Sequence, residues 1–584
     1  MIRATALALA LAIASPCAFA QQATDTVAPE KATQATAREV VHAKTYMVAA
    51  ANPLAAEAGR AILAAGGNAI DAMVTVQLVL GLVEPQSSGL GGGAFLVYYD
   101  AASGKLTTFD GRETAPAEAT PRLFQDGEGK PLKFFDAVVG GRSVGVPGTP
   151  MLLAQAHERY GKLDWVQVTE PAIELAENGF EVSPRLAALI AADAERLSRF
   201  ETTRRYFFDA SGAPLKSGHR LVNQLYADTL RAIAEDGVTN AFYTGPVAQR
   251  IVDTVRNAPG NPGVMSLADL ANYRVKERDP VCVAYRGAEV CGMGPPSSGA
   301  LTVGQILGMI EPFDIAALGP DDPQAWRIIG DASRLAFADR GRYMADIDFV
   351  PMPLKGLVDP SYLAARSQLL RTDRALAAEA VTPGEPGWDH AMRLGDDTSL
   401  ELPSTSHFSI VDAQGNVVSM TTTIENGFGS RLMTDGFLLN NELTDFSFET
   451  HDGRGVIANA VAPGKRPRSS MTPTIVMQGD KPWIAIGSPG GSRIIGYVAQ
   501  ALVAMIDWKM NAQQAVAMPH LVNRFGTFDL EAETTAADLA DDLEALGFKV
   551  KAGELDSGLH AIEITGAGLF GGADPRREGV ALGD

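Results

Sequence analysis

The part of the sequence that most constrains the fold is residues 404–412 together with residues 417–424. Apolar and small polar residues alternate in both runs, and the short connection between them contains Gly415 and Asn416. This pattern is typical of a β-hairpin. Residues 382–404 differ, because turn formers and acidic residues follow one another there without a sustained period. We therefore predict a flexible strap that leads into a buried strand.

Thr405 lies where the strap meets the hairpin. Its hydroxyl could attack the carbonyl of Ser404 and move the acyl group from nitrogen to oxygen, so that hydrolysis leaves Thr405 as a new N-terminus. The new α-amine would have a pKa of about 7.7–8.0, so its neutral fraction could accept the hydroxyl proton. The alternative interpretation is an ordinary threonine at a strand end.

A series of motifs follows in a fixed order: TSHFS (405–409), GFG (427–429), LNNE (439–442), DFS (445–447), KRPRSSM (465–471) and GSPGGSR (487–493). Together they resemble the gamma-glutamyltransferases, or glutathione hydrolases, a family of N-terminal nucleophile hydrolases. The resemblance covers nearly the whole chain after its first 20 residues. It is specific for the family and less specific for the substrate.

The resemblance implies an α+β fold, the four-layer αββα sandwich, formed jointly by two chains cut from one precursor. The heavy chain would be residues 21–404, ending in the strap, and the light chain would be residues 405–584. The two chains would stay associated. The implied activity is cleavage of γ-glutamyl amides such as glutathione, with transfer to water, amino acids or peptides. No metal or organic cofactor is implied.

The resemblance also implies catalytic roles for four residues. Thr405 would be the nucleophile, Thr423 would orient it, and the backbone N–H groups of Gly490 and Gly491 would form the oxyanion hole. The pattern of strand, glycine turn and helix at residues 483–506 agrees, because a helix N-terminus favours an anion. A phosphate loop is the alternative, but the Lys-Ser/Thr ending of that motif is missing.

The implied substrate-binding residues are Arg112, Glu425, Glu442, Asp445, Ser469 and Ser470. Arg112 and the two serines match donors to the substrate α-carboxylate, for which a planar guanidinium is well suited. Asp445 matches the aspartate that binds the α-ammonium, whereas Glu425 stands where well-known members carry asparagine. Carboxylates that converge in this way raise one another's pKa unless a cation lies among them. A donor with an ammonium group is therefore favoured over a plain glutaryl group.

The N-terminus predicts export. Residues 1–20 read as a secretory signal, with an early Arg3, a short apolar run and a small-x-small cleavage site at residues 18–20. The composition from Gln21 to about Val40 predicts a flexible tail. No later stretch is long and apolar enough for a membrane helix. We expect a secreted, periplasmic protein.

Composition excludes several other classes of protein. The net charge of −20 argues against nucleic-acid binding and against anionic membrane surfaces, which both need clustered Lys and Arg. No CxxC or HExxH spacing occurs, so no metal site is predicted. Cys282 and Cys291 flank a likely hairpin, and both a disulfide between them and two reduced thiols remain open.

Apolar periodicity predicts helices at 53–65, 69–82, 149–160, 165–179, 184–198, 299–310, 323–344, 360–380, 493–506 and 536–546. Asn68 should cap the second of these. Strands are predicted at 94–99, 106–109, 483–486 and 561–564, and near Lys549. The glycine run at 88–93 precedes a strand and lacks GxGxxG spacing, which disfavours a dinucleotide site.

Two other functions remain open. One is a related acylase that cleaves glutaryl or cephalosporin-type amides with the same Thr405. Turnover of γ-glutamyl and glutaryl anilides separates the acylase hypothesis from the gamma-glutamyltransferase hypothesis, because only the γ-glutamyl anilide carries the ammonium group. The other is an inactive periplasmic binding protein that kept the fold, in which case the wild type has no turnover to lose.

Overall fold

The structure is a computed structural model that describes residues 37–388, 392–397, 399, 401, 402 and 404–584 of the chain. The predicted signal sequence, most of the predicted tail and part of the strap lie outside these residues.

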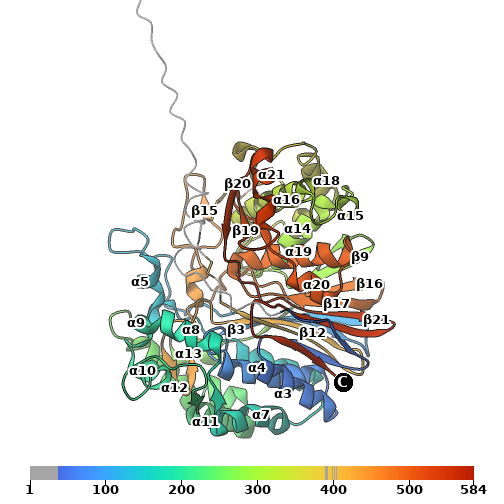
Figure 1. Cartoon of the computed structure of the whole chain (residues 1–584). Coiled ribbons are helices and arrows are strands. Elements are labelled where there is room, and N and C mark those ends of the chain that lie inside the picture. The colour runs from blue at the N-terminus through green and yellow to red at the C-terminus, as the bar shows by residue number, and fades with distance from the viewer. Residues whose placement is uncertain (1–36, 389–391, 398, 400, 403) are drawn as a thin grey trace, which may run out of the picture.

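Two seven-stranded antiparallel sheets form the centre of the described structure (Figure 1). Sheet I contains, in spatial order, β23 (Val580–Gly583), β2 (Met47–Ala50), β11 (Ser406–Val411), β12 (Val417–Thr423), β3 (Gly93–Asp100), β4 (Lys105–Gly111) and β7 (Lys276–Arg278). Sheet II contains β1 (Val41–Ala43), β22 (Gly568–Ala573), β21 (His560–Thr565), β17 (Lys481–Gly487), β16 (Thr474–Gln478), β9 (Ala288–Gly292) and β8 (Val281–Tyr285). The predicted mixture of helices and strands is confirmed.

The predicted hairpin is formed by β11 and β12 in the middle of sheet I. Ser406 lies opposite Thr422 in the antiparallel register, and the next position of this register places Thr405 opposite Thr423. Because side chains alternate along a strand, Phe408 points into the core on the helical side and Val411 into the layer between the sheets. Both faces of the hairpin are therefore buried.

Helices cover the outer face of each sheet, and Figure 1 shows α3 and α4 below the strands and α14 and α19 above them. The helices on the side of sheet I include α3 (Pro53–Ala64), α4 (Ala69–Val83), α6 (Thr149–Tyr160), α7 (Trp165–Asn178) and α11 (Gln224–Asp236). Those on the side of sheet II include α14 (Gly299–Ile310), α16 (Pro323–Tyr343) and α19 (Ile494–Ile506). All 15 residues of α4 are buried, because it is apolar on every side. The predicted cap at Asn68 is present.

Three of the predicted helices are shorter than their patterns suggested. Of the one predicted at 536–546, only α21 (Ala540–Leu546) is α-helical. The helix predicted at 360–380 is wrong beyond α18 (Pro360–Gln368), because the backbone N–H groups of Ala375 and Leu376 donate to Leu546 and Asp331 instead of continuing the helix. The one predicted at 184–198 is interrupted at Asp193, which accepts a hydrogen bond from Arg431. Tertiary partners decide where the helices predicted at 360–380 and 184–198 end.

The sequence analysis did not predict α11 or α12 (Pro246–Arg256), although both have one buried apolar face that periodicity can detect. The other helices are α5 (Phe134–Val138), α8 (Pro184–Ala192), α9 (Ala194–Leu197), α10 (Glu201–Phe207), α13 (Leu267–Ala271), α15 (Ile315–Leu318), α17 (Leu354–Leu357), α20 (Ala512–Ala517) and α21 (Ala540–Leu546). The short strands outside the two main sheets are β5 (Phe180–Glu181), β6 (Arg220–Leu221), β10 (Leu394–Gly395), β13 (Met433–Thr434), β14 (Phe437–Leu438), β15 (Val456–Ile457), β18 (Leu521–Asn523), β19 (Thr527–Glu531) and β20 (Lys549–Gly553).

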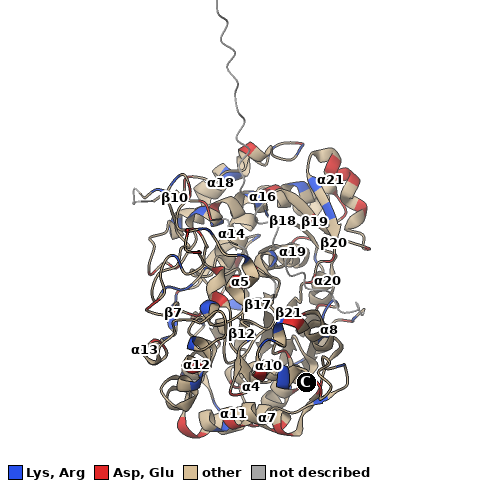
Figure 2. Ribbon diagram, turned by 90° about the vertical axis from the view of Figure 1, so that its left-hand side faces the viewer, with Lys and Arg blue, Asp and Glu red and all other residues tan. Residues whose placement is uncertain are grey.

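Cys282 and Cys291 lie opposite each other on β8 and β9 and are joined by a disulfide. In Figure 2 the basic segments are scattered among acidic and neutral ones, and α21 carries a group of acidic residues. Within the described part of the chain, no helix combines the length and apolarity that crossing a membrane requires.

Candidate active site

The junction between the strap and β11 brings three oxygen atoms together. Thr405 Oγ1 lies 2.5 Å from the carbonyl oxygen of Ser404 and 3.4 Å from Thr423 Oγ1. Thr423 Oγ1 also donates to the Ser404 carbonyl, at 2.9 Å, and accepts from the backbone N–H of Glu425, at 2.8 Å. The hairpin register thus places the hydroxyls of Thr405 and Thr423 beside the peptide bond between Ser404 and Thr405. That arrangement is suited to attack by Thr405 on the carbonyl that precedes it.

The residues on either side of this peptide bond are held by buried partners. Ser404 Oγ donates to the backbone carbonyl of Gln86 at 3.0 Å, and Ser406 Oγ donates to the Glu84 carboxylate at 2.8 Å. Burial raises the pKa of Glu84 to about 7. Arg577 donates to the carbonyl of Thr405 at 3.4 Å. The glycine run that begins soon after Glu84 lies against the site, because a Cβ atom on Gly92 would lie 2.0 Å from the backbone carbonyl oxygen of Thr423.

Gly490 and Gly491 connect β17 to α19, as predicted. Both have left-handed backbone angles, with φ of 131° and 58°. The strap runs directly over Gly491, because a Cβ atom on this residue would lie 2.9 Å from the carbonyl carbon of Leu402. Glycine is therefore required here by conformation and by the close approach of another chain segment.

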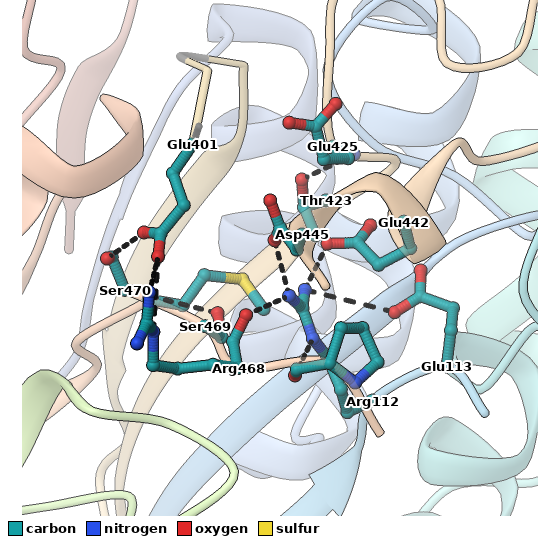
Figure 3. A network of polar contacts seen from close by, with 12 residues as sticks. Arg112, Glu113, Glu401, Thr423, Glu425, Glu442, Asp445, Arg468, Ser469 and Ser470 are labelled. Carbon is teal, nitrogen blue, oxygen red and sulfur yellow. Dashed lines mark hydrogen bonds and ion pairs between the residues drawn. The ribbon is translucent and has the colours of Figure 1, made fainter. Parts of the chain in front are cut away.

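Arg112 lies at the centre of a buried acidic cluster (Figure 3). Its guanidinium bonds to the Glu442 carboxylate and, at 2.6 Å, to that of Asp445. It also donates to the backbone carbonyls of Pro467 and Arg468. The sequence predicts that converging carboxylates raise one another's pKa unless a cation lies among them. Arg112, which was predicted to bind the substrate carboxylate, lies among these carboxylates. Most of its N–H donors are therefore already in use.

We call Glu113, Glu425, Glu442 and Asp445, which surround Arg112, the acidic corner. The pKa values of these four carboxyl groups are raised. Glu113 lies 4.0 Å from Arg112, and Asn441 donates to Glu425. Burial, followed by the charge of Glu442, raises the pKa of Glu425 to about 8. Burial also raises the pKa of Glu113, Glu442 and Asp445, and the charge of Arg112 opposes these increases. An added cation would be stabilised in this corner.

Ser469 and Ser470 face different partners. The Ser469 hydroxyl accepts from the backbone N–H of Met471 at 3.1 Å. The Ser470 hydroxyl donates to the Glu401 carboxylate of the strap and accepts from Arg340 at 2.8 Å. Arg340 and Arg468 both donate to Glu401 as well. We call Arg340, Arg468 and Ser470 the basic corner.

The predicted site residues thus fall into three groups that meet around one strap. Thr405 and Thr423 flank the peptide bond, the glycine loop lies under residues 401 and 402, and Arg112 links the two corners because it bonds to the Arg468 carbonyl. Comparison with known proteins identifies the family. The profile of the gamma-glutamyltranspeptidase family matches residues 55–584. The chain belongs to this family.

The proteins that are similar over nearly the full length include two curated relatives and one solved structure. The chain is 38% identical over 558 residues to the glutathione hydrolase proenzyme of Bacillus subtilis (strain 168), covering 94% of this chain and 92% of the relative. Identity to the glutathione hydrolase proenzyme of Escherichia coli (strain K12) is 36% over 546 residues, covering 92% and 91%. The crystal structure of cephalosporin acylase from Bacillus halodurans has a TM-score of 0.81 at 28% identity, covering 95% of this chain and 99% of that one.

The predicted family and the prediction of an enzyme are confirmed by these similarities. Both curated relatives are named proenzymes, which fits a gamma-glutamyltranspeptidase precursor that is cut into two associated chains. Among the described residues, no group of three or more histidine, cysteine or acidic side chains is arranged to hold a metal ion.

Several residues of the site were not predicted from the sequence. Glu113 directly follows the predicted Arg112, and Arg468 directly precedes Ser469 inside the KRPRSSM motif that was used to recognise the family. Glu401 was treated as part of a flexible strap, and Arg340 as part of an ordinary helix. The position of Glu401, four residues before Thr405, is a signal that it belongs to the site. Its partners are distant in the sequence, so its contacts were not predictable.

Proposed function

We propose that this gamma-glutamyltranspeptidase cleaves γ-glutamyl amides such as glutathione and transfers the γ-glutamyl group to water, amino acids or peptides. The observation that carries the proposal is the peptide bond between Ser404 and Thr405. Its carbonyl oxygen accepts from both Thr405 and Thr423, within a chain whose curated relatives include glutathione hydrolase proenzymes.

The first reaction would be cleavage of the chain by itself. Thr405 Oγ1 attacks the carbonyl carbon of Ser404, its proton passes to the Thr405 nitrogen, and the C–N bond breaks as an ester forms. Water then hydrolyses the ester, so that Ser404 becomes a C-terminal carboxylate and Thr405 gains a free amine and a free hydroxyl. The products would be chains 21–404 and 405–584, which stay associated through the shared sheets.

The second reaction would use the new N-terminus. The α-amine of Thr405 takes the proton from Oγ1, and the oxygen attacks the γ-carbonyl carbon of the substrate. The N–H groups of Gly490 and Gly491 would stabilise the oxyanion, while Thr423 orients the nucleophile. The leaving amine takes the proton as the C–N bond breaks. Water or an acceptor amine then releases the γ-glutamyl group from its ester.

Substrate binding would use both corners. Glu442, Asp445 and Glu425 would hold the α-ammonium, because an added cation offsets the repulsion among these buried carboxylates. Ser469, Ser470 and Arg112 would hold the α-carboxylate. The two charges of one amino acid would then match the two corners.

The proposal extends to architecture and location. The two stacked sheets with helices outside them support the four-layer αββα sandwich of N-terminal nucleophile hydrolases. The sequence of residues 1–20 supports export to the periplasm.

The test is the denaturing intact mass of the purified wild type beside Thr405→Ala. We expect two wild-type chains, the smaller beginning at Thr405, and one uncut mutant chain. Activity toward a γ-glutamyl anilide should accompany the cut form. A wild type that is active as a single chain would show that Thr405 is not an N-terminal nucleophile.

The similarity to cephalosporin acylase favours one alternative, an acylase for glutaryl or cephalosporin-type amides with the same nucleophile. The acidic corner argues for an ammonium-bearing substrate. Turnover of γ-glutamyl and glutaryl anilides by the same preparation decides between them, and faster turnover of the glutaryl compound would favour the acylase.

A further inference from the structure

The strap is held in place by acidic side chains that meet arginines. Glu401 is buried, and its carboxylate bonds to Arg340. It also bonds to Arg468 at 3.3 Å and to the Ser470 hydroxyl, as Figure 3 shows. Although burial opposes ionisation, the two guanidinium groups lower the pKa of Glu401 to about 2. This carboxylate is therefore an anion at any physiological pH.

Its neighbours in the strap are held in the same way. Asp397 lies 2.9 Å from Arg468, and Asp396 lies 2.8 Å from Arg342. Leu394 and Gly395 form β10, which pairs in parallel with β15. The described part of the strap from 394 onward is thus mostly buried. The flexibility predicted from composition did not take these partners into account.

Glu401 lies four residues before the nucleophile, on the segment that crosses the glycine loop. Leu402 packs against Gly491, and Ser404 Oγ is bonded to the Gln86 carbonyl. Because the side chains of Glu401 and Ser404 are both bonded to buried partners, the Ser404 carbonyl has little freedom to move. Restricting a reacting group in this way speeds an intramolecular reaction.

The Glu401 carboxylate also has the chemistry of the ligand expected in its place. Ser470 is one of the residues predicted to bind the substrate α-carboxylate, yet in the uncut chain its hydroxyl donates to Glu401. One hydroxyl proton cannot serve both carboxylates. The strap and the substrate would therefore compete for the basic corner.

We propose that Glu401 is a positioning residue for self-cleavage. Its carboxylate occupies the basic corner of the uncut chain, holds the Ser404 carbonyl against Thr405, and yields this corner to the substrate carboxylate once the strap is free to leave. The part that concerns the substrate rests on the proposed function, whereas the part that concerns self-cleavage does not.

The first experiment measures the rate at which uncut chain becomes two chains, by denaturing mass. We expect Glu401→Gln and Glu401→Ala to slow cleavage by about 10- to 100-fold, the effect of losing a charged hydrogen bond. Glu385→Gln is the matched control, because Glu385 is an exposed acid of the same strap. Added acetate should restore part of the rate to Glu401→Ala, since it can re-enter the basic corner.

Cleavage of both Glu401 variants at the rate of the control would overturn the proposal. Slow cleavage that acetate leaves unchanged would also count against it, because a purely structural role predicts that result. Glu401→Gln keeps the shape of the side chain, so it tests the charge even when Glu401→Ala does not fold.

The second experiment measures L-glutamate binding by calorimetry in uncut Thr405→Ala and in Thr405→Ala/Glu401→Ala. Removal of the internal carboxylate should tighten binding by about 10-fold or more. Equal affinities would show that Glu401 does not occupy the substrate position.

The two proposals fail in different ways. A wild type that cuts itself but cleaves neither anilide defeats the proposed function and leaves the role of Glu401 in cleavage intact, since cleavage is measured by mass alone. A wild type that turns over the γ-glutamyl anilide, together with Glu401 variants that mature at the normal rate, defeats only the role of Glu401.

Discussion

The acidic and the basic corner lie side by side but are built in opposite ways. In the acidic corner the carboxylates belong to the folded body of the protein, and Arg112 compensates part of their charge. In the basic corner the arginines belong to the body, and the compensating carboxylates, Glu401 and Asp397, come from the strap.

Because of this difference, one precursor can be stable and still become a binding site. A charge that is compensated by the body stays compensated after cleavage, whereas a charge compensated by the strap is exposed when the strap leaves. The acidic corner then has room for a cation and the basic corner for an anion. This is the charge pattern of an amino acid, with its ammonium and its carboxylate.

Removal of Arg112 from the acidic corner should lower the stability of the protein more than removal of Arg340 from the basic corner. In the uncut Thr405→Ala background, we expect Arg112→Ala to lower the free energy of unfolding by about 3–5 kcal/mol, because it leaves buried carboxylates without their cation. Arg340→Ala should cost less, about 1–3 kcal/mol, because Glu401 keeps Arg468 as a partner. Urea unfolding of the two variants measures both values. Equal losses would show that the corners are not compensated differently.

Asp445→Asn should separate substrates by their ammonium group. We expect kcat/KM for a γ-glutamyl anilide to fall by about 10- to 100-fold, because the amide no longer offers a charged partner. The glutaryl anilide, which lacks the ammonium, should be affected much less. The exposed Glu449 of the same segment provides the control variant Glu449→Gln. Parallel losses on both anilides would place the ammonium elsewhere.

Glu425→Gln should change the pH dependence of stability. The folded-state pKa of Glu425 is raised to about 8, so between about pH 5 and pH 8 the folded chain binds a proton that the unfolded chain has lost. Stability contributed by this group therefore falls as pH rises through that window, by at most about 1.4 kcal/mol per pH unit. Glutamine does not titrate, so the variant should gain on the parent Thr405→Ala chain toward pH 8. A pH-independent difference in urea unfolding would contradict this.

The sequence alone determined the parts of the molecule that depend on local pattern. The alternation in residues 404–424 produced the hairpin, and its register brought Thr405 opposite Thr423. Uniform apolarity produced the buried helix α4, and Asn68 capped it. The ordered motifs identified the family, because each motif is recognised from its own residues, whatever fold the segments between the motifs adopt.

Only the tertiary structure decided which charges meet. Arg112 and Glu442 are separated by 330 positions, and Arg340 and Ser470 by 130, so no periodicity relates them. The end of the helix predicted at 360–380 was likewise set by hydrogen bonds to residues far away in the sequence. Glu401 shows the physical reason most clearly. Its composition and neighbours are those of a loop, and it is fixed because folding places two arginines and a serine hydroxyl where a carboxylate is stabilised.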